Sequence, residues 1–599
     1  MHSKSRWILG PALALALTGV PPMGAAAVAT DAPRPTPTPG ITVRHLGNTG
    51  TKLFDRVQSG PRGLRNLDAA AQQRAAAINH MSLSHLEAML SHDSTVRLGT
   101  DGRIFYADTM KALPAQANAT DSVRAAQWST FPLSSALTLH SDPGSDHTIY
   151  LDFNGYTMPS QSYWSTPAAG LTANHTYGGF SLDATTTGAF STAEEQYIQD
   201  VWRIVAEKYS PMDVDVTTED PGQDAYNRTS ATDTTYGTHV VITNDMTARP
   251  TGCDADLTGG CLGVGLLGVF NQNEQGIPDY LEPAWVFTKF TAADDVLPAG
   301  VIANDAAHEI GHTVGLDHDR ISGQDYYPGH DDWFPIMGAS DLAIGQFNNG
   351  GYPGYVSDQT DPDGVTIDGD DYHVMNLNGL PTRADDVSGT KALGSAANYL
   401  QNGVIETAAD VDTYQVNRTC TNAMTATATG IGMGQSVDLQ VTIKDPNGVV
   451  QATADPAASH LTPQTFPDTP TGMDASAQVA SATTGLWTVS VEGVGLAGSA
   501  GYSDYGSVGQ YNLSITGCTG SGGVAPDAPT GGSVELTARS TSATIHWAAP
   551  VNHGDSAITG YAISGTPFAV ANPGAGATSA VLTHLVPGTT YDVQVAASN

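Results

Sequence analysis

The chain has 599 residues, which is too long for one compact core and predicts several domains. Its 60 acidic and 24 basic side chains give a formal net charge of −36, so a polyphosphate partner would be repelled. This charge argues against binding to nucleic acid or to an anionic membrane surface, and it is typical of a protein that is soluble outside the cell. Hydrophobic residues make up 40% of the chain, which indicates a globular protein.

Residues 1–29 have the layout of a secretory signal peptide. Two basic residues, Lys4 and Arg6, precede an apolar run from Trp7 to Val20, and small residues follow near Ala29. The run is shorter than the roughly 20 apolar residues that a membrane-spanning helix needs, so export is favoured over a membrane anchor. We therefore expect a secreted, extracellular protein with no membrane span.

Residues 30–140 are expected to form a pro-segment ahead of the first core strand. A flexible stretch, APRPTPTPG, is followed by a run rich in helix formers from Leu64 to Leu90. A hairpin is then predicted around the turn formed by residues 100–102. Exported enzymes often carry such a segment, and a small independent N-terminal domain is the alternative interpretation.

Residues 141–385 alternate predicted strands with predicted helices. The strands are HTIYLDFNGY, MDVDVTTE, THVVITND, GVGLLGVF and AWVFTKF, which begin at residues 147, 212, 238, 263 and 284. A capping box of Ser191 and Glu194 begins one amphipathic helix, and LPAGVIANDAAHEIGHTVGLDH, from Leu297, is a second helical run. This order predicts an α/β sheet with helices packed on it.

Beyond Asp386 only short strands separated by turn residues are predicted. Residues 386–519 have the pattern of a β-sandwich, residues 520–528 form a Gly/Pro linker, and residues 529–599 repeat the all-β pattern. The sequence stops directly after TYDVQVAASN, so we expect this last domain to be truncated by one strand. The fold class is therefore a multidomain chain with an α/β domain followed by two all-β sandwich domains.

Four cysteines are all in the exported part of the chain, and an even number in a secreted protein favours disulfides. A pair of Cys253 with Cys261 would close a short loop, and a pair of Cys420 with Cys518 would join the ends of the 386–519 domain. Free buried thiols are the alternative. A four-cysteine zinc site does not fit, because no CxxC pair is present.

The segment HEIGHTVGLDHD is the strongest chemical signal in the sequence. His308 and His312 are four residues apart, so on a helix they share a face and can bind one metal ion. Glu309 lies beside them, within reach of a water at that ion. Gly315 can end the helix at a positive φ and so return His318 as a third imidazole ligand. Three such ligands leave the open position of a catalytic zinc site.

A single Zn²⁺ ion bound in this way would lower the pKa of a bound water toward about 7. Glu309 would then take the water's proton and pass it to the leaving amine, while the zinc polarises the scissile carbonyl. Two histidines at this spacing are often only a helix surface. The complete H-E-x-x-H-x-x-G-x-x-H pattern, however, is expected by chance in about one sequence of this composition per ten thousand.

HEIGHTVGLDH resembles the extended zinc motif of the metzincin metalloproteases, and Asp319 after it resembles the ending of the adamalysin/reprolysin branch. That family also has a methionine-containing turn downstream, and FPIMGAS supplies Met337. The resemblance implies a metzincin-type catalytic domain at residues 141–385. It further implies that Met337 forms an apolar floor under the ligands and that Asp319 is a buried structural anchor.

The same resemblance implies that GVGLLGVF is an edge strand that binds peptide substrate, with glycines that let a backbone approach closely. A plain core strand is the alternative. Ala339 and Ser340 follow Gly338, so no tyrosine ligand of the astacin and serralysin kind is assigned. No cysteine precedes Cys253, which excludes latency by a pro-segment cysteine of the matrix-metalloprotease kind.

A candidate for a second metal site is the Asp-rich stretch TDPDGVTIDGDDYHV, from Thr360 to Val374. One interpretation is a Ca²⁺ site, although the spacing does not fit an EF-hand loop. The other is an Asp/Gly turn that caps a helix beginning near Asp370.

The all-β part of the chain carries two further resemblances. The stretch from ETAADVDTYQV to QYNLSITG resembles the bacterial pre-peptidase C-terminal domain, and ITGYAISG with TYDVQVAASN resembles a fibronectin type III module. These resemblances imply attachment or association with substrate, and contact with extracellular matrix or polysaccharide, rather than chemistry.

The sequence therefore predicts a secreted zinc endopeptidase, made as a zymogen, that acts on a protein or peptide substrate. Two alternatives stay open. The chain is a secreted adhesin or matrix-binding protein with an inactive protease domain, or it is a zinc-dependent amidase acting on a non-protein substrate. The intact Glu309 argues against a decayed protease domain.

Overall fold

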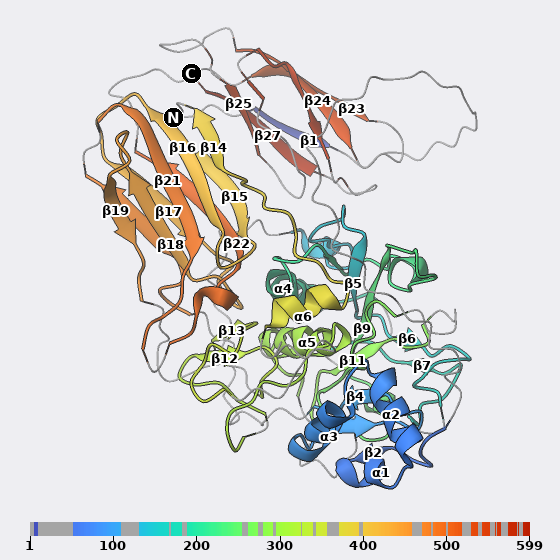
Figure 1. The fold of residues 1–599 in the computed structure, drawn as a ribbon. Helices are drawn as coiled ribbons and strands as arrows, with labels where there is room; N and C mark the ends of the chain where they lie inside the picture. The colour runs from blue at the N-terminus through green and yellow to red at the C-terminus, as the bar shows by residue number, and fades with distance from the viewer. Residues whose placement is uncertain are drawn as a thin grey trace. The chain divides into compact units, whose positions relative to one another are not determined.

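A computed structural model describes residues 5–9, 52–108 and 131–598 of the chain (Figure 1). Within these bounds it leaves out residues 167–168, 183–188, 254–260, 273–278, 292–294, 325, 340–342, 356–369, 395–398, 458–469, 481–482, 499–500, 518–528, 537–541, 551–557, 559, 565–572, 575, 584 and 586–590. The chain splits into two compact units. One unit holds β1 and the strands β23 to β27, and the other holds the elements from β2 to β22.

Residues 52–108 form three short helices and a small sheet. The helices α1 (Pro61–Arg65), α2 (Ala69–Ile78) and α3 (Leu83–His92) occupy the run in which helix formers were found. The strands β2 (Gln58–Ser59), β3 (Val96–Leu98) and β4 (Ile104–Tyr106) pair antiparallel in the order β2-β3-β4. The hairpin predicted around residues 100–102 is confirmed.

The central element of the next part is a five-stranded sheet in the order β10-β11-β9-β5-β8. Its strands are β5 (His147–Asp152), β8 (Asp215–Thr217), β9 (Tyr236–Thr243), β10 (Gly263–Val264) and β11 (Ala284–Phe287). Four strands are parallel, and β10 at the edge is antiparallel to β11. Each of the five segments expected to be a strand supplies one strand of this sheet.

Two long helices pack with this sheet. Helix α4 (Thr192–Lys208) begins with the predicted capping box of Ser191 and Glu194, and α5 (Ala299–Thr313) contains the histidine motif. Their apolar faces join the sheet in one core because apolar residues recur at helical spacing on each helix. This core contains Ile149, Leu151, Ile198, Val201, Val205, Val240, Ile242, Val286, Ile302, Ala306 and Ile310.

The strand β10 is much shorter than the predicted strand GVGLLGVF. Beyond Val264 the backbone turns to the end of α5, where Gly268 N donates to His312 O at 2.8 Å and Phe270 N donates to Thr313 O at 2.9 Å. Residues 268–270 therefore satisfy helix carbonyls that would otherwise lack partners instead of prolonging β10.

Short elements complete this part of the chain. They are η1 (Leu133–Ser135), β6 (Tyr156–Thr157), β7 (Thr176–Tyr177), η2 (Gln223–Ala225), η3 (Met246–Ala248), β12 (Trp333–Pro335), β13 (Ile344–Gln346) and α6 (Asp371–Leu377). The strands β6 and β7 pair antiparallel, and β12 and β13 pair parallel.

Strands β14 to β22, within residues 390–516, form two sheets, β14-β16-β21-β18-β19 and β15-β22-β17-β20. Buried and partly exposed residues alternate along most of these strands, which is typical of a sandwich. Its elements are β14 (Thr390–Gly394), β15 (Tyr399–Ile405), β16 (Val411–Arg418), β17 (Met424–Thr429), β18 (Leu439–Lys444), β19 (Val450–Ala454), β20 (Ala475–Val479), β21 (Gly485–Gly493), η4 (Asp504–Gly506) and β22 (Gly509–Thr516).

The compact unit that holds β1 and the strands β23 to β27 also contains two sheets, β23-β24-β26 and β1-β27-β25. Its C-terminal strands are β23 (Thr530–Leu536), β24 (Ala543–Ala548), β25 (Gly560–Ser564), β26 (Ser579–Leu582) and β27 (Tyr591–Ser598). The strand β1 (Ser5–Leu9) lies within the predicted signal peptide and pairs antiparallel with β27. An added strand satisfies main-chain groups that an open sheet edge leaves unpaired.

No helix within the described ranges is both long and apolar enough to cross a membrane. The predicted signal peptide is described only at Ser5–Leu9.

One buried carboxyl in the sandwich gives a testable pH dependence. Asp438 is 1% exposed and its Oδ2 accepts from the hydroxyl of Tyr502 at 2.7 Å. Burial raises the pKa of Asp438 from 3.8 to about 7. Because the folded chain then holds a proton that the unfolded chain has released, this carboxyl lowers stability as pH rises between about 4 and about 7.

We therefore expect Asp438→Asn to remove a pH-dependent loss of stability. The melting temperature of Asp438→Asn should rise relative to that of the parent as the pH increases from about 4 to about 7. A difference in melting temperature that stays constant across this pH range would contradict the raised pKa.

Candidate metal centre

Helix α5 and the turn after it bring the three histidines of the motif together. His308 and His312 lie on one face of α5, and the helix ends at the cap residue Val314. Gly315 follows with φ of +95°, and a Cβ there would overlap the side chain of Asn378. The turn at Gly315 therefore requires glycine, and it returns His318 to the other two rings, as the motif spacing predicts.

The three imidazoles turn the same ring nitrogen toward one point. Their Nδ1 atoms have separate partners: Ile336 O at 2.7 Å from His308, Leu316 O at 2.8 Å from His312 and Asp93 Oδ2 at 2.6 Å from His318. An Nδ1–H that donates to an oxygen leaves the Nε2 lone pair for a metal ion.

The spacing of the nitrogen atoms fits a tetrahedral ion. The Nε2 atoms of His308 and His318 are 3.2 Å apart. Two ligands each about 2.0 Å from a tetrahedral zinc would be separated by about 3.3 Å. The side chains of all three histidines are at most 4% exposed, so the point at which they meet is screened from solvent.

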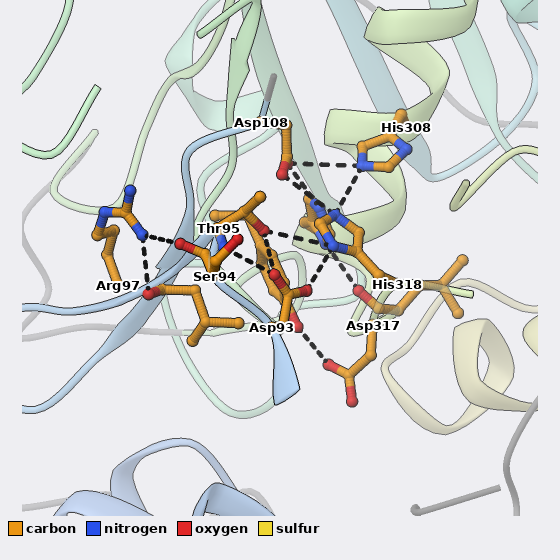
Figure 2. A network of polar contacts seen from close by, with 12 residues as sticks. Asp93, Ser94, Thr95, Arg97, Asp108, His308, Asp317 and His318 are labelled. Atoms are coloured by element: carbon orange, nitrogen blue, oxygen red, sulfur yellow. Dashed lines mark hydrogen bonds and ion pairs between the residues drawn. The ribbon is translucent and has the colours of Figure 1, made fainter. Parts of the chain in front are cut away.

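A carboxylate from the N-terminal segment completes the group. Oδ2 of Asp108 lies 3.1 Å from His312 Nε2 and 3.5 Å from His308 Nε2, and its Oδ1 lies 3.2 Å from His318 Nε2. All four ligand atoms are within 4.8 Å of one another. The described part of the chain therefore contains a His/Asp group with the geometry of a metal site (Figure 2).

Glu309 lies beside this group and is completely buried. Neither of its carboxylate oxygens has a hydrogen-bond partner among the described residues. Burial, with the nearby carboxylates of Asp108 and Asp305, raises the pKa of Glu309 well above its usual value. A buried carboxylate without a partner is costly unless it serves a ligand or a reaction.

The position of Glu309 explains Gly263 of β10 and Gly265 directly after it. A Cβ on Gly263 would overlap the carboxylate of Glu309, and a Cβ on Gly265 would lie 2.9 Å from its Oε2. From the sequence, these glycines were expected to admit a substrate backbone. In the structure, the space that they leave on this side is taken by the side chain of Glu309.

The carboxylates of Asp108 and Asp93 favour a positive charge at His318, whereas burial disfavours one at His312. Burial lowers the pKa of His312 to about 4. His318 is equally buried, but the carboxylates of Asp108 and Asp93 outweigh its desolvation and raise its pKa to about 10. A divalent ion would satisfy the same carboxylates while the imidazoles stay neutral, as metal ligands must be.

The two remaining motif residues, Met337 and Asp319, are both buried beside the histidine turn. Met337 is fully buried against α5, since a Cβ on Gly311 would overlap its sulfur. Asp319 N donates to Met337 O at 2.9 Å, which joins the histidine turn to the methionine turn. The carboxylate of Asp319 accepts from Asn348 Nδ2 at 2.9 Å and from Tyr352 OH at 3.0 Å, and burial raises its pKa to about 6.

Four residues at the site were not found from the sequence. Tyr106 stacks on His312 with ring centroids 3.8 Å apart, and Tyr326 stacks on His318 at 4.0 Å. Asp93 and Asp108 contact the histidines through their carboxylates. The only sequence signal was the tripeptide Tyr-Ala-Asp that ends the predicted hairpin, and no local rule connects it with a motif two hundred residues later.

The cysteine and calcium predictions have partial answers. Cys253 is disulfide-bonded to Cys261, as predicted. Cys420 is also disulfide-bonded, but Cys518 lies outside the described residues, so their pairing stays a prediction.

The Asp-rich stretch is described only from Asp370 onward, where Oδ1 of Asp370 accepts from His373 N and caps α6. This agrees with the capping interpretation. A second group of carboxylates, with ligand atoms within 4.8 Å of one another, consists of Asp385, Glu406 and Asp410.

Comparisons with known proteins identify one module. The model of the fibronectin type III domain matches residues 527–599, so this part of the chain is a fibronectin type III domain, as predicted for residues 529–599. No curated protein matches the chain.

Two solved structures are each similar to 22% of this chain. One is the pre-peptidase C-terminal domain of a collagenase from Bacillus anthracis, with 13% identity over 22% of this chain and 99% of that chain and a TM-score of 0.15. The other is PliG of Aeromonas hydrophila, a periplasmic lysozyme inhibitor, with 14% identity over 22% and 99% and a TM-score of 0.13. At these TM-scores the two likenesses carry no inference, and the pre-peptidase C-terminal resemblance stays a prediction.

The contact between Gly263 and Glu309 can be tested by a double-mutant cycle. Gly263→Ala should destabilise the chain by about 1–3 kcal/mol because the added methyl group overlaps the Glu309 carboxylate. In a Glu309→Ala background most of this cost should disappear. Gly574→Ala, where a Cβ meets nothing within 4 Å, is the control. Equal costs of Gly263→Ala in both backgrounds, measured by thermal unfolding, would contradict this placement of Glu309.

Proposed function

We propose that the chain is a secreted zinc-dependent endopeptidase of the metzincin group, with its catalytic domain at residues 141–385. The observation that carries the proposal is the convergence of three imidazole Nε2 atoms beside a buried carboxylate without a hydrogen-bond partner, that of Glu309. A purely structural zinc site would have no use for a second, unligated carboxylate beside the ion.

The donor atoms fit zinc better than they fit calcium or magnesium. Imidazole nitrogen suits Zn²⁺, whereas the two hard cations are bound by six or more oxygens. The acceptors on the three Nδ1 atoms are the outer partners that usually orient zinc-binding histidines. His308, His312 and His318 would hold the ion.

Zinc, when bound, supplies a Lewis acid that polarises a substrate carbonyl and makes a water more acidic. The chain's own part in the reaction is the transfer of the proton. Glu309 accepts a proton from the attacking water and donates it to the leaving amine. Its burial suits the second step, because a carboxyl with a raised pKa holds the proton until the amine takes it.

Substrate binding is assigned to the outer edge of β10 and the segment after it. The inner edge of β10 pairs with β11. Its outer edge, which residues 104–108 cover in the intact chain, would offer main-chain groups to an extended peptide once it is uncovered. Recognition through main-chain groups suits protein and peptide substrates. The fibronectin type III domain is a common binding module, and we assign it the attachment role suggested for the all-β part of the chain.

The role of Glu309 is tested by Glu309→Gln in the processed, zinc-loaded protein. We expect the variant to keep about one zinc per chain and to lose casein hydrolysis by about 10²–10⁴-fold, the usual contribution of a general base. The exposed Asp224→Asn, which also removes one carboxylate, is the matched control. Full activity in Glu309→Gln would disprove the assignment.

Metal binding gives a separate prediction. His312→Ala should lose zinc, because it removes one of three ligands and leaves the site incomplete. A chelator should abolish casein hydrolysis by the parent, and added Zn²⁺ should restore it. Stoichiometric zinc in purified His312→Ala, measured by elemental analysis, would contradict the ligand assignment.

The same assays separate the two alternatives. A processed chain that binds zinc but hydrolyses no protein would favour the amidase on a non-protein substrate. A chain that neither binds zinc nor hydrolyses protein, yet adheres to matrix or polysaccharide, would favour the adhesin.

A further inference from the structure

The end of the N-terminal segment is added to the sheet as an extra strand. Residues 104–108 run antiparallel to residues 263–267, with Phe105 opposite Leu266 and Asp108 opposite Gly263. Four main-chain hydrogen bonds join them: Tyr106 N to Gly265 O (3.0 Å), Asp108 N to Gly263 O (3.1 Å), Leu262 N to Asp108 O (2.8 Å) and Leu267 N to Ile104 O (3.1 Å). The segment thus occupies the edge that the proposed function assigns to substrate.

This strand places Asp108 against the metal ligands. The carboxylate of Asp108 is completely buried and faces the Nε2 atoms of His308, His312 and His318 at 3.1–3.5 Å. A buried carboxylate is stable only when it is paired with a cation or is a metal ligand. Three imidazoles and one carboxylate make up the four ligands of a closed tetrahedral zinc site.

Neighbouring residues of the same segment fix the position of the carboxylate. Tyr106 lies flat on the ring of His312 and donates its hydroxyl proton to Asp317 at 3.0 Å. His85 contacts the other oxygen of Asp317 at 3.2 Å, and Asp93 accepts from Nδ1 of His318. The segment therefore contacts the site on several sides, as Figure 2 shows for Asp93, Asp108 and His318.

We propose that Asp108 is the fourth ligand of the metal in the intact chain and that residues 52–108 keep the enzyme latent. This inference rests on the proposed function. The carboxylate takes the one coordination position that three imidazoles leave open, and the strand of residues 104–108 takes the place of the peptide. Access of substrate then requires removal of the segment. The carboxylate of Asp108 thus takes the place of the pro-segment cysteine that keeps matrix metalloproteases latent and that this sequence lacks.

The ligand role of Asp108 is tested on the full chain in a Glu309→Gln background, which prevents self-cleavage. The probe is Co²⁺ in place of zinc, because its visible absorption reports the ligands of the ion. Asp108→Asn keeps the shape of the side chain and removes its charge. We expect it to change the cobalt spectrum and to speed loss of Co²⁺ to a chelator by at least about tenfold, because loss of even an outer partner of a metal ligand typically costs about 10–100-fold in affinity.

The control is Asp55→Ala, which removes an exposed carboxylate of the same segment and should leave the spectrum and the release rate unchanged. A spectrum and release rate of Asp108→Asn equal to those of its parent would overturn the ligand role.

Latency is measured with Glu309 restored. Unprocessed chain carrying Asp108→Asn should hydrolyse casein at least about tenfold faster than unprocessed parent. Equal rates would overturn latency through Asp108. A different result would disprove the proposed function: processed, zinc-loaded parent that hydrolyses no protein. In that case the cobalt spectrum of the full chain would still test the ligand role of Asp108.

Discussion

The site depends on the orientation of three imidazole rings, each fixed by a hydrogen bond at Nδ1. Two of the acceptors are main-chain carbonyls, Ile336 O and Leu316 O, and both belong to the turns around the histidine motif. The ring of His312 is thus oriented by the turn that Gly315 makes, and the ring of His308 by the methionine turn. The surrounding fold supports these turns through Asp319, which joins them, and through Met337 beneath α5.

The third acceptor, Asp93, comes from the N-terminal segment. Removal of that segment would therefore take away both Asp108 and the partner of His318. The same step opens the metal position, clears the edge of β10 and frees Nδ1 of His318 for another acceptor. It also removes the negative charge that, after burial, contributes most to the raised pKa of Glu309. One structural change would thus act on the metal position, the edge of β10 and the proposed base together.

Much of the site could be predicted because its information is local. The spacing of His308, His312 and His318 follows from helical periodicity and one glycine turn, and the strands of the sheet follow from apolar runs. The contacts of Asp93 and Asp108 could not be predicted, since Asp93 is 225 residues from His318 and Asp108 is 204 residues from His312. The predicted length of β10 was wrong because the carbonyls at the end of α5 accept hydrogen bonds from the backbone N–H groups of Gly268 and Phe270. Sequence patterns do not record such competition.

The central claim is a zinc ion bound by three histidines, with Asp108 as the fourth ligand in the intact chain. X-ray absorption at the zinc edge of purified full-length protein tests it most directly. The account predicts one zinc per chain with three imidazole nitrogens and one carboxylate oxygen, all at about 2.0–2.2 Å. A sulfur ligand, a six-oxygen shell or the absence of zinc would contradict it.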